Sequence, residues 1–332
     1  MIEMMLEYYK DKKILIFGGL GMIGSTIANK LVKMGAKVTI ADSRIVPYGA
    51  NIFNIKLILN SVKLRNIDIR DRDKLASVID DNEIVFCLAG QVSHNDSIRD
   101  PFLDADINYI GHLNILETVK NVNRKIKLVY SGTRLQYGRI EENPVNENHP
   151  QKPLTPYSLN KSAAENLYLF YNRVYGIPVI SLRISNPYGP RGQMKHYKYG
   201  IVNWFIRQAM EGNDINIYGS GEQLRDYIYI DDLVDLFVKV AMTPKAEGNV
   251  FNSGSGIGVP FKNMVKTVIN IVKSGHINYI PWPEDYVHIE TGDYVSDISK
   301  IKSVINWKPK VDIVEGIKKT FIYYEKYLEN YI

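Results

Sequence analysis

The first half of the chain alternates short apolar runs with segments whose apolar residues recur at helical spacing. Residues 13–17 (KILIF) end in glycines, and residues 22–34 carry apolar side chains three and four positions apart before Gly35. Further strands are predicted at 37–42, 63–68, 83–89, 125–132 and 178–185, and further helices at 72–80, 102–120 and around Tyr157. Such near-continuous apolar strands between helices predict an α/β fold with a doubly wound parallel sheet covered on both faces.

The turn after the first strand, GGLGMIG, brings four glycines together at the start of the following helix. Glycine lets the backbone turn tightly and lie against a pyrophosphate at a helix N-terminus, which is typical of a dinucleotide site. Asp42 closes the second strand, where a carboxylate accepts hydrogen bonds from the adenosine ribose and repels a 2′-phosphate. We therefore expect NAD rather than NADP, although Arg44 would soften that repulsion. Asp68 is placed either to meet the adenine or to cap the next helix.

Tyr157 and Lys161 stand four apart at the start of a predicted helix, in TPYSLNKSAAENLYLFY. Positions i and i+4 share one helix face, so the two polar ends point at one spot. A solvated surface pair is one interpretation. The other is an acid/base site, in which the ammonium of Lys161 lowers the pKa of the Tyr157 phenol toward the working pH.

With these features, the sequence resembles the extended short-chain dehydrogenase/reductases, and within them the nucleotide-sugar epimerase/dehydratase family. The resemblance covers nearly the whole chain and includes FCLAGQVSHNDS (86–97), YSGTRLQYG (130–138), LRISNPYGP (182–190), IYGSGEQLRDYIYIDDLVD (217–235), FNSGSG (251–256) and WKPK (307–310). It implies that Tyr157 takes a proton from a sugar hydroxyl as hydride moves to NAD. Lys161 would lower the Tyr157 pKa and hold the nicotinamide ribose, and Thr133 would steady the substrate oxygen.

The expected architecture is a Rossmann domain over residues 1–185 and a smaller mixed α/β domain, binding a nucleotide sugar, over residues 186–332. The chain is expected to return to the first domain around residues 225–255. The expected cofactor-binding residues are Gly18, Gly21, Met22, Ile23, Gly24, Asp42, Ser43, Asp68, Ile69, Leu88, Ala89, Gly90, Ser131, Tyr157 and Lys161. The expected substrate-binding residues are Gln91, Thr133, Asn186, Lys195, Lys198 and Arg225.

Two departures from the family pattern narrow the expected reaction. The 4,6-dehydratases carry Asp and Glu directly after the Thr, whereas this chain has Arg134 and Leu135. The related decarboxylases carry Glu at the position of Leu135, so elimination and decarboxylation are both disfavoured. This leaves 4-epimerisation through a transient 4-keto sugar, or one-way chemistry by a 4-ketoreductase or C4 dehydrogenase. A non-catalytic NAD-binding scaffold is a different class, which the intact Thr133, Tyr157 and Lys161 disfavour.

The second half is expected to hold the diphosphate. The resemblance implies that Asn186 and Arg225 contact it, because arginine can grip phosphate oxygens with two hydrogen bonds. An ion pair with Asp226 is the alternative role for Arg225. Family members often carry an arginine where this chain has Glu290, which an anionic diphosphate would not favour. The segment RGQMKHYKYG (191–200), with Arg191, Lys195, His196 and Lys198, either compensates for that loss or is a solvated loop.

Composition and charge limit the remaining possibilities. A net charge of +5 over 332 residues, without dense basic runs, makes nucleic acid an unexpected partner. The single cysteine, Cys87, lies in an apolar run and favours a reducing compartment. The opening residues do not have the pattern of a signal peptide, and no apolar stretch is long enough for a membrane span, so we expect a cytoplasmic protein. His94 and His196 lack companions of metal-ligand type, so no metal is expected. A homodimer is the family expectation.

Overall fold

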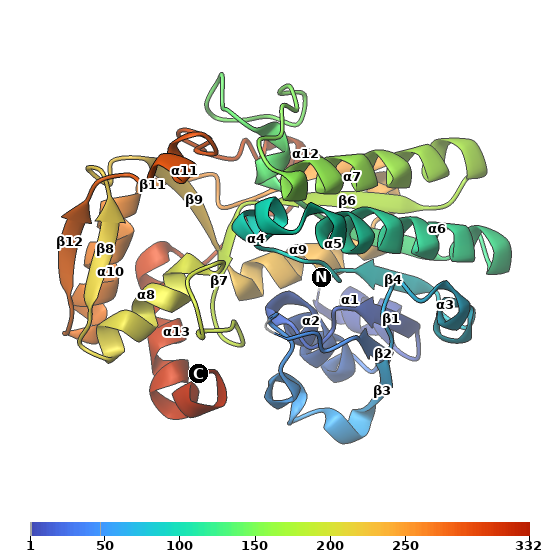
Figure 1. Cartoon of the computed structure of the whole chain (residues 1–332). Helices are drawn as coiled ribbons and strands as arrows, with labels where there is room; N and C mark the ends of the chain where they lie inside the picture. Colours follow the sequence, from blue (N-terminus) through green and yellow to red (C-terminus); the bar gives the residue numbers. More distant parts are fainter. Residues whose placement is uncertain (1, 47) are drawn as a thin grey trace.

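The computed structural model of the protein describes residues 2–46 and 48–332. Seven parallel strands form its central sheet, in the order β10-β6-β5-β4-β1-β2-β3 (Figure 1). They are β1 (Lys13–Phe17), β2 (Lys37–Asp42), β3 (Val62–Asn66), β4 (Ile84–Cys87), β5 (Lys127–Thr133), β6 (Val179–Ile184) and β10 (Asn249–Ser253). The strand order reverses between β1 and β4. In doubly wound sheets, ligands bind beyond the carboxyl ends of the strands at such a point.

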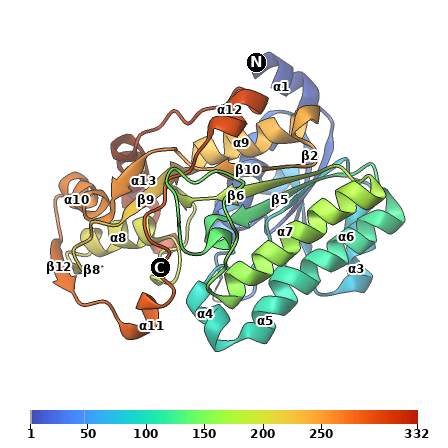
Figure 2. The ribbon, with the colours of Figure 1, turned by 90° about the horizontal axis from the view of Figure 1, so that it is seen from above.

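Helices cover both faces of this sheet (Figure 2). On one face lie α3 (Arg72–Ile79), α6 (Gly111–Val122) and α7 (Pro156–Tyr175), and on the other lie α1 (Ile2–Tyr9), α2 (Met22–Lys33) and α9 (Ile230–Met242). Ile14 and Ile16 of β1 join the core shared with α2 and α9, whereas Leu15 and Phe17 join the core shared with α6 and α7. Because successive side chains of a strand point to opposite faces, a strand buried on both sides reads as an unbroken apolar run.

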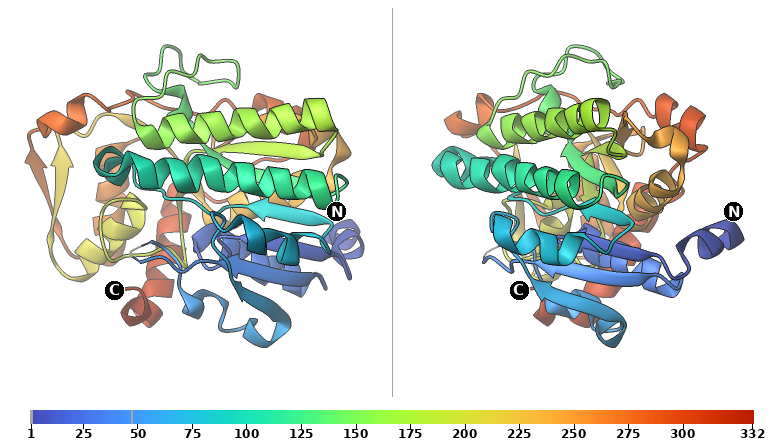
Figure 3. Two further views of the ribbon diagram at one scale, coloured as in Figure 1. Left: turned by 45° about the vertical axis from the view of Figure 1, so that its right-hand side comes forward. Right: turned by 90° about the vertical axis from the view of Figure 1, so that its right-hand side faces the viewer.

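The predicted doubly wound parallel sheet is confirmed, but several boundaries differ from the prediction. The predicted helix 102–120 consists of α5 (Pro101–Ala105), a π-helical turn η3 (Asp106–Ile110) and α6. The predicted strand 83–89 ends at Cys87, because Leu88 and Ala89 continue as loop along a cavity wall. A further helix, α4 (His94–Arg99), follows that loop. In Figure 3, the teal α5–α6 segment and the yellow-green α7 run side by side across one face of the sheet.

A smaller mixed α/β part lies beside the sheet, at the left of Figure 1. Its strands are β7 (Asn186–Tyr188), β9 (Leu224–Tyr229) and β11 (Gly258–Pro260) in one sheet, and β8 (Asp214–Tyr218) and β12 (His276–Ile280) in another. Its helices are α8 (Ile201–Met210), α10 (Phe261–Val272), α11 (Glu284–Val287) and α13 (Ile313–Tyr327). Helix α12 (Ser299–Ile305) lies instead beside the large sheet, where it contacts β10 (Figure 2). Between β9 and β11 the chain returns to the large sheet, where α9 packs on α2 and β10 pairs with β6. Across the described residues, no helix combines the length and apolar character needed to cross a membrane.

Candidate active site

A cavity of about 890 Å³ lies between the carboxyl ends of the large sheet and the smaller part. Most of the residues expected to bind cofactor or substrate line it. They are Gly18, Gly21, Met22, Ile23, Gly24, Asp42, Ser43, Asp68, Ile69, Leu88, Ala89, Gly90, Gln91, Ser131, Thr133, Tyr157, Lys161, Asn186, Lys198 and Arg225. The fold thus brings together segments far apart in sequence, although lining alone does not test each residue's predicted role.

The glycine turn has the shape that a pyrophosphate needs. Gly18 has φ +73°, and a Cβ there would lie 2.8 Å from the backbone nitrogen of Ala89. A Cβ on Gly24 would clash with the carbonyl oxygen of Gly18, so only glycine lets α2 begin so close to β1. The N-terminus of α2 therefore faces the cavity without side chains in the way, and its free N–H groups suit an anion.

Asp42 is buried at the end of β2. Its carboxylate accepts hydrogen bonds from the backbone nitrogens of Leu20 at 3.0 Å and Arg44 at 2.9 Å. Burial raises the pKa of Asp42, and these two hydrogen bonds oppose the rise. Each oxygen keeps a further lone pair, so the carboxylate can accept from the ribose diol of NAD.

Asp68 does not cap the following helix, because Asp71 holds the N-cap position of α3. The carboxylate of Asp68 instead pairs with the guanidinium of Arg70, with contacts between 2.6 and 3.1 Å. The N-cap alternative is therefore wrong. The contact between Asp68 and adenine stays a prediction.

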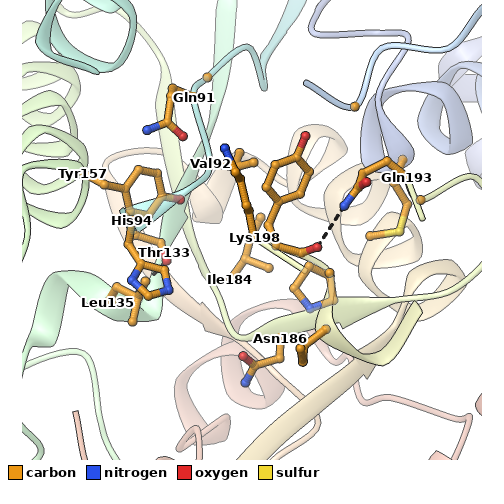
Figure 4. A pocket seen from close by; sticks show the side chains of 18 of the residues that line it. Gln91, Val92, His94, Thr133, Leu135, Tyr157, Ile184, Asn186, Gln193 and Lys198 are labelled. Atoms are coloured by element: carbon orange, nitrogen blue, oxygen red, sulfur yellow. Dashed lines mark hydrogen bonds between the residues drawn. The ribbon is translucent and has the colours of Figure 1, made fainter. Parts of the chain in front are cut away.

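Thr133, Tyr157 and Lys161 meet at the cavity wall, where Thr133 and Tyr157 point inward (Figure 4). Thr133 ends β5. Tyr157 and Lys161 lie in the first turns of α7, whose start is fixed by a capping box between Thr155 and Ser158. Because the exposed fractions are 8% for Thr133, 7% for Tyr157 and 4% for Lys161, the interpretation as a solvated surface pair is wrong.

Burial controls the titration of this trio. It raises the pKa of Tyr157 to about 12; a hydrogen bond with Thr133 opposes the rise and the charge of Asp104 adds to it. Burial lowers the pKa of Lys161 to about 7, whereas the charges of Asp104, Cys87 and Glu165 raise it. In the protein alone, the pKa of Tyr157 is therefore raised and not lowered as predicted, because desolvation dominates.

Asp104, which the sequence analysis missed, is a fully buried carboxylate beside this trio. It accepts hydrogen bonds from the side-chain amides of Gln91 and Asn108, both at 3.0 Å, and of Asn160 at 2.8 Å. Asp104 and Asn108 are four apart with the apolar Ile107 between them, so they share a buried helix face. Polar residues on an otherwise apolar helix face are the sequence pattern from which Asp104 and Asn108 could have been predicted as site residues.

Arg225 pairs with Glu290, not with Asp226. Its Nη2 lies 2.5 Å from the Glu290 Oε1, and its Nη1 donates to the carbonyls of Leu224 and Gly292. Asp226 accepts instead from Ser255 and from the backbone nitrogens of Gly256 and Ser296. The alternative of an ion pair with Asp226 is thus wrong, because β9 points the two side chains to opposite faces, and the contact of Arg225 with a diphosphate stays a prediction.

Arg134 adds a second buried guanidinium to the same wall. It donates to Thr291 Oγ1 at 3.0 Å and lies 5.3 Å from the ring centroid of Tyr294. Burial lowers its pKa to about 10, and the nearby charge of Arg225 acts in the same direction. Arg134 therefore stays a cation at neutral pH, and this wall offers two cations and one carboxylate to an anionic ligand.

The basic side chains of segment 191–200 do not form one site. The Lys198 Nζ lies 2.9 Å from both carboxylate oxygens of Asp96. Arg191 reaches Thr26, with 3.4 Å between Nη1 and Oγ1. The side chain of Lys195 is exposed and does not line the cavity, so the structure does not bring Lys195 to the expected substrate site.

Aromatic side chains of the smaller part line the cavity as well, and the sequence analysis missed them. The ring of Tyr218 lies 5.4 Å from that of Trp282 and 5.5 Å from that of Tyr286, between centroids. Such rings are suited to stack on a nucleobase. Their signal was weak: Tyr218 is the last residue of β8, Trp282 follows β12 after one residue, and Tyr286 lies in α11. Within the described residues, no group of three or more His, Cys, Asp and Glu side chains could hold a metal ion.

The family model of the NAD dependent epimerase/dehydratase family matches residues 14–254. The chain belongs to this family. The match spans the glycine turn, Thr133, Tyr157, Lys161 and Arg225, which line the cavity, whereas Trp282, Tyr286 and Glu290 of the cavity wall lie beyond it. NAD is accordingly the cofactor, and the shape of the glycine turn and the carboxylate of Asp42 fit it.

Three relatives illustrate the range of the family. The chain is 34% identical to a putative UDP-glucose 4-epimerase of Methanocaldococcus jannaschii, over 92% of this chain and 96% of that protein. It is 30% identical to the CDP-paratose 2-epimerase of Salmonella typhi, over 93% and 98%. The solved structure of UDP-glucose 4-epimerase from Thermotoga maritima with UDP-glucose superposes with a TM-score of 0.88 at 30% identity, covering 95% and 99% of the two chains. The family thus includes more than one activity.

Proposed function

We propose that this protein is an NAD-dependent nucleoside-diphosphate-sugar 4-epimerase. The observation that carries the proposal is the meeting of Thr133, Tyr157 and Lys161 in one cavity with the glycine turn and the Arg134–Arg225 wall. NAD bound between the glycine turn and Tyr157 would supply the hydride acceptor and, once reduced, the hydride donor that C4 inversion needs. Tyr157, as its phenolate, would accept the proton of the C4 hydroxyl and give it back, while Thr133 bonds to the same oxygen. Because burial raises the Tyr157 pKa in the protein alone, the positive charges of Lys161 and of bound NAD would have to favour that phenolate.

Arg134 and Leu135 favour epimerisation over elimination of water or carbon dioxide. In the 4,6-dehydratases that the chain resembles, Asp and Glu at these positions act as acid and base. Leu135 cannot transfer a proton. Arg134, with a pKa of about 10, stays charged at neutral pH and cannot act as a base. Hydride transfer without elimination is the chemistry that these side chains support. The relative from Methanocaldococcus jannaschii, a putative UDP-glucose 4-epimerase, is in line with this proposal.

The test is a panel of UDP-, dTDP-, GDP- and CDP-sugars incubated with the purified protein and NAD. A 4-epimerase converts one sugar to its C4 stereoisomer, seen by NMR, without lasting absorbance in the NADH band. The Tyr157→Phe variant should bind NAD normally and lose activity by about 100-fold or more, because only the ionisable oxygen is gone. Lasting NADH would point instead to a C4 dehydrogenase, and a dehydrated or decarboxylated product would refute the assignment.

We also infer that two copies of the chain associate through α5 and α7. Leu159, Phe170 and Val174 follow one another at helical spacing on α7, and their exposed fractions are 57%, 39% and 53%. Phe102 on the neighbouring α5 is 83% exposed. An apolar patch of this kind is typical of an interface. Light scattering should report a dimer that Phe170→Glu weakens, and a monomeric unmutated protein would contradict the inference.

A further inference from the structure

His94 lies at the start of α4, on the wall that holds the catalytic trio. The helix start is fixed by Ser93, whose Oγ accepts from the backbone nitrogen of Asp96 at 3.1 Å. In Figure 4 the imidazole of His94 lies beside Thr133 and Leu135 and close to Tyr157, and it points into the cavity. The sequence analysis considered this residue only as a metal ligand.

Both ring nitrogens of His94 are without an internal hydrogen bond in the part of the chain that the structure describes. By contrast, His112 contacts the Tyr168 hydroxyl at 3.0 Å and the Ala89 carbonyl at 3.2 Å. The side chain of His94 is half-buried and its imidazole faces the cavity, where a bound molecule can supply hydrogen bonds. The imidazole of His94 is therefore available to a molecule in the cavity.

The His94 ring is neutral at physiological pH. Burial lowers its pKa to about 4, and the charge of Arg134 acts in the same direction, while the charges of Glu290 and Asp96 oppose it. A neutral imidazole has one N–H donor and one nitrogen acceptor, which matches a sugar hydroxyl that both donates and accepts. It matches a diphosphate poorly, because phosphate oxygens only accept and favour cations.

Gln91, which was expected to contact the substrate, is already engaged. Its side-chain amide donates to the carbonyl of Ser93 at 2.7 Å and to Asp104 at 3.0 Å, and its carbonyl oxygen accepts from the Ser93 nitrogen. The side chain is 2% exposed. His94 therefore offers the cavity a ring without a hydrogen bond among the described residues, while Leu135 and Ile184 supply apolar surface in the same cavity (Figure 4).

We propose that His94 binds the substrate by a hydrogen bond from its neutral imidazole to a sugar hydroxyl next to the carbon that Tyr157 and Thr133 serve. The proposal rests on the proposed function in taking the ligand to be a nucleoside-diphosphate sugar. His94 would thereby recognise the sugar, while Arg134 and Arg225 recognise the diphosphate.

The experiment compares the affinity for the sugar nucleotide with that for its free nucleoside diphosphate. Both are titrated by calorimetry into NAD-loaded Tyr157→Phe protein, which does not turn over, with and without His94→Phe. We expect His94→Phe to lower the affinity for the sugar nucleotide about three- to tenfold, which is the effect of one neutral hydrogen bond. The affinity for the free diphosphate should change less than twofold. His94→Asn, which keeps a donor and an acceptor, should recover part of the loss. His276→Asn, an exposed histidine of β12, is the matched control and should change neither affinity.

If His94→Phe lowers the affinities for both ligands equally, His94 acts on the diphosphate or on the shape of the cavity. That result would overturn the proposal. An unchanged sugar-nucleotide affinity would overturn it too. A pH dependence of sugar-nucleotide affinity between pH 6 and 8 that His94→Phe abolishes would reveal a charged imidazole and contradict the neutral ring. This experiment measures binding and not turnover. If His94→Phe weakens only the binding of the sugar nucleotide, and the protein epimerises none of the sugars tested, the proposed 4-epimerase activity is refuted while the role of His94 in sugar binding stands.

Discussion

The guanidinium of Arg225 is held by the carboxylate of Glu290, with 2.5 Å between Nη2 and Oε1 at the cavity wall. Glu290 stands where the family often has an arginine, so a carboxylate occupies part of the surface that would face a diphosphate. The side chain of Arg225 is 9% exposed and that of Glu290 is 28% exposed. The ion pair therefore withdraws part of the Arg225 charge from any anionic ligand.

Removal of the Glu290 charge should strengthen diphosphate binding. Glu290→Gln keeps the shape of the side chain and frees Arg225, so we expect the inhibition constant of the free nucleoside diphosphate to fall about three- to tenfold. Arg225→Ala should raise that constant by tenfold or more. Glu284→Gln, which removes an exposed carboxylate from α11, is the control for general surface charge. Weaker binding by Glu290→Gln would instead mean that Glu290 is needed to orient Arg225.

The parts of the site that were predictable from sequence are those built from neighbouring residues. The glycine turn, the end of β2 at Asp42, and the pair of Tyr157 and Lys161 each depend on spacing within one strand, turn or helix. The parallel arrangement of the sheet follows from the alternation of strands and helices, whereas the strand order was not predicted. Local periodicity therefore predicted the sheet. It also placed the glycine turn, the carboxylate of Asp42 and the pair of Tyr157 and Lys161 at the carboxyl ends of its strands.

The parts that were missed depend on contacts across the fold. Arg225 meets Glu290 65 residues later, and Lys198 meets Asp96 102 residues earlier. Neither pairing leaves a periodic signal in the sequence. The pKa of Tyr157 was misjudged for the same reason, because it depends on how deeply the packed fold buries the phenol. The π-helical turn η3 was invisible as well, since its apolar residues fit an ordinary helix.

Asp104 should control the charge of Lys161. Its carboxylate raises the Lys161 pKa against burial, so Asp104→Asn should lower that pKa below its present value of about 7. Lys161 would then lose its proton at a lower pH, and any decline in NAD affinity that follows its deprotonation should move to lower pH. The measurement is the NAD dissociation constant between pH 5.5 and 8.5.

Two controls separate this charge effect from damage to the fold. Asp106→Asn removes an exposed carboxylate two residues away and should leave the pH profile unchanged. Asp104→Asn should also lower thermal stability, because its amide presents a donor where the carboxylate accepted hydrogen bonds, a loss of about 1–3 kcal/mol. A fall in stability with an unshifted pH profile would assign Asp104 a structural role alone.

Asp42 should set the cofactor preference. Its buried carboxylate would repel the 2′-phosphate of NADP, so the unmutated protein should bind NAD more tightly than NADP. Asp42→Asn should reduce the ratio of the affinities for NAD and NADP. The substitution removes the negative charge and one hydrogen-bond acceptor while it keeps the size of the side chain. The dissociation constants of both dinucleotides are measured by protein fluorescence. Equal affinities in the unmutated protein would show that Arg44 overrides the carboxylate.

Lys198 and Asp96 should act as one unit that fastens segment 191–200 to α4. Two contacts of 2.9 Å join the ammonium to the carboxylate, and both side chains are partly buried. If the pair holds this segment beside the cavity, Lys198→Met and Asp96→Asn should lower the affinity for the nucleoside diphosphate to a similar degree, about two- to fivefold. The double variant should then bind the nucleoside diphosphate with the same affinity as either single variant.

A direct contact between Lys198 and the diphosphate makes the opposite prediction for the carboxylate. Lys198→Met would then weaken binding, whereas Asp96→Asn would free the ammonium and strengthen it. Lys195→Met is the matched control, because Lys195 belongs to the same segment but is exposed outside the cavity, and it should leave binding unchanged. The sign of the Asp96→Asn effect therefore decides whether this lysine binds the substrate or holds the segment in place.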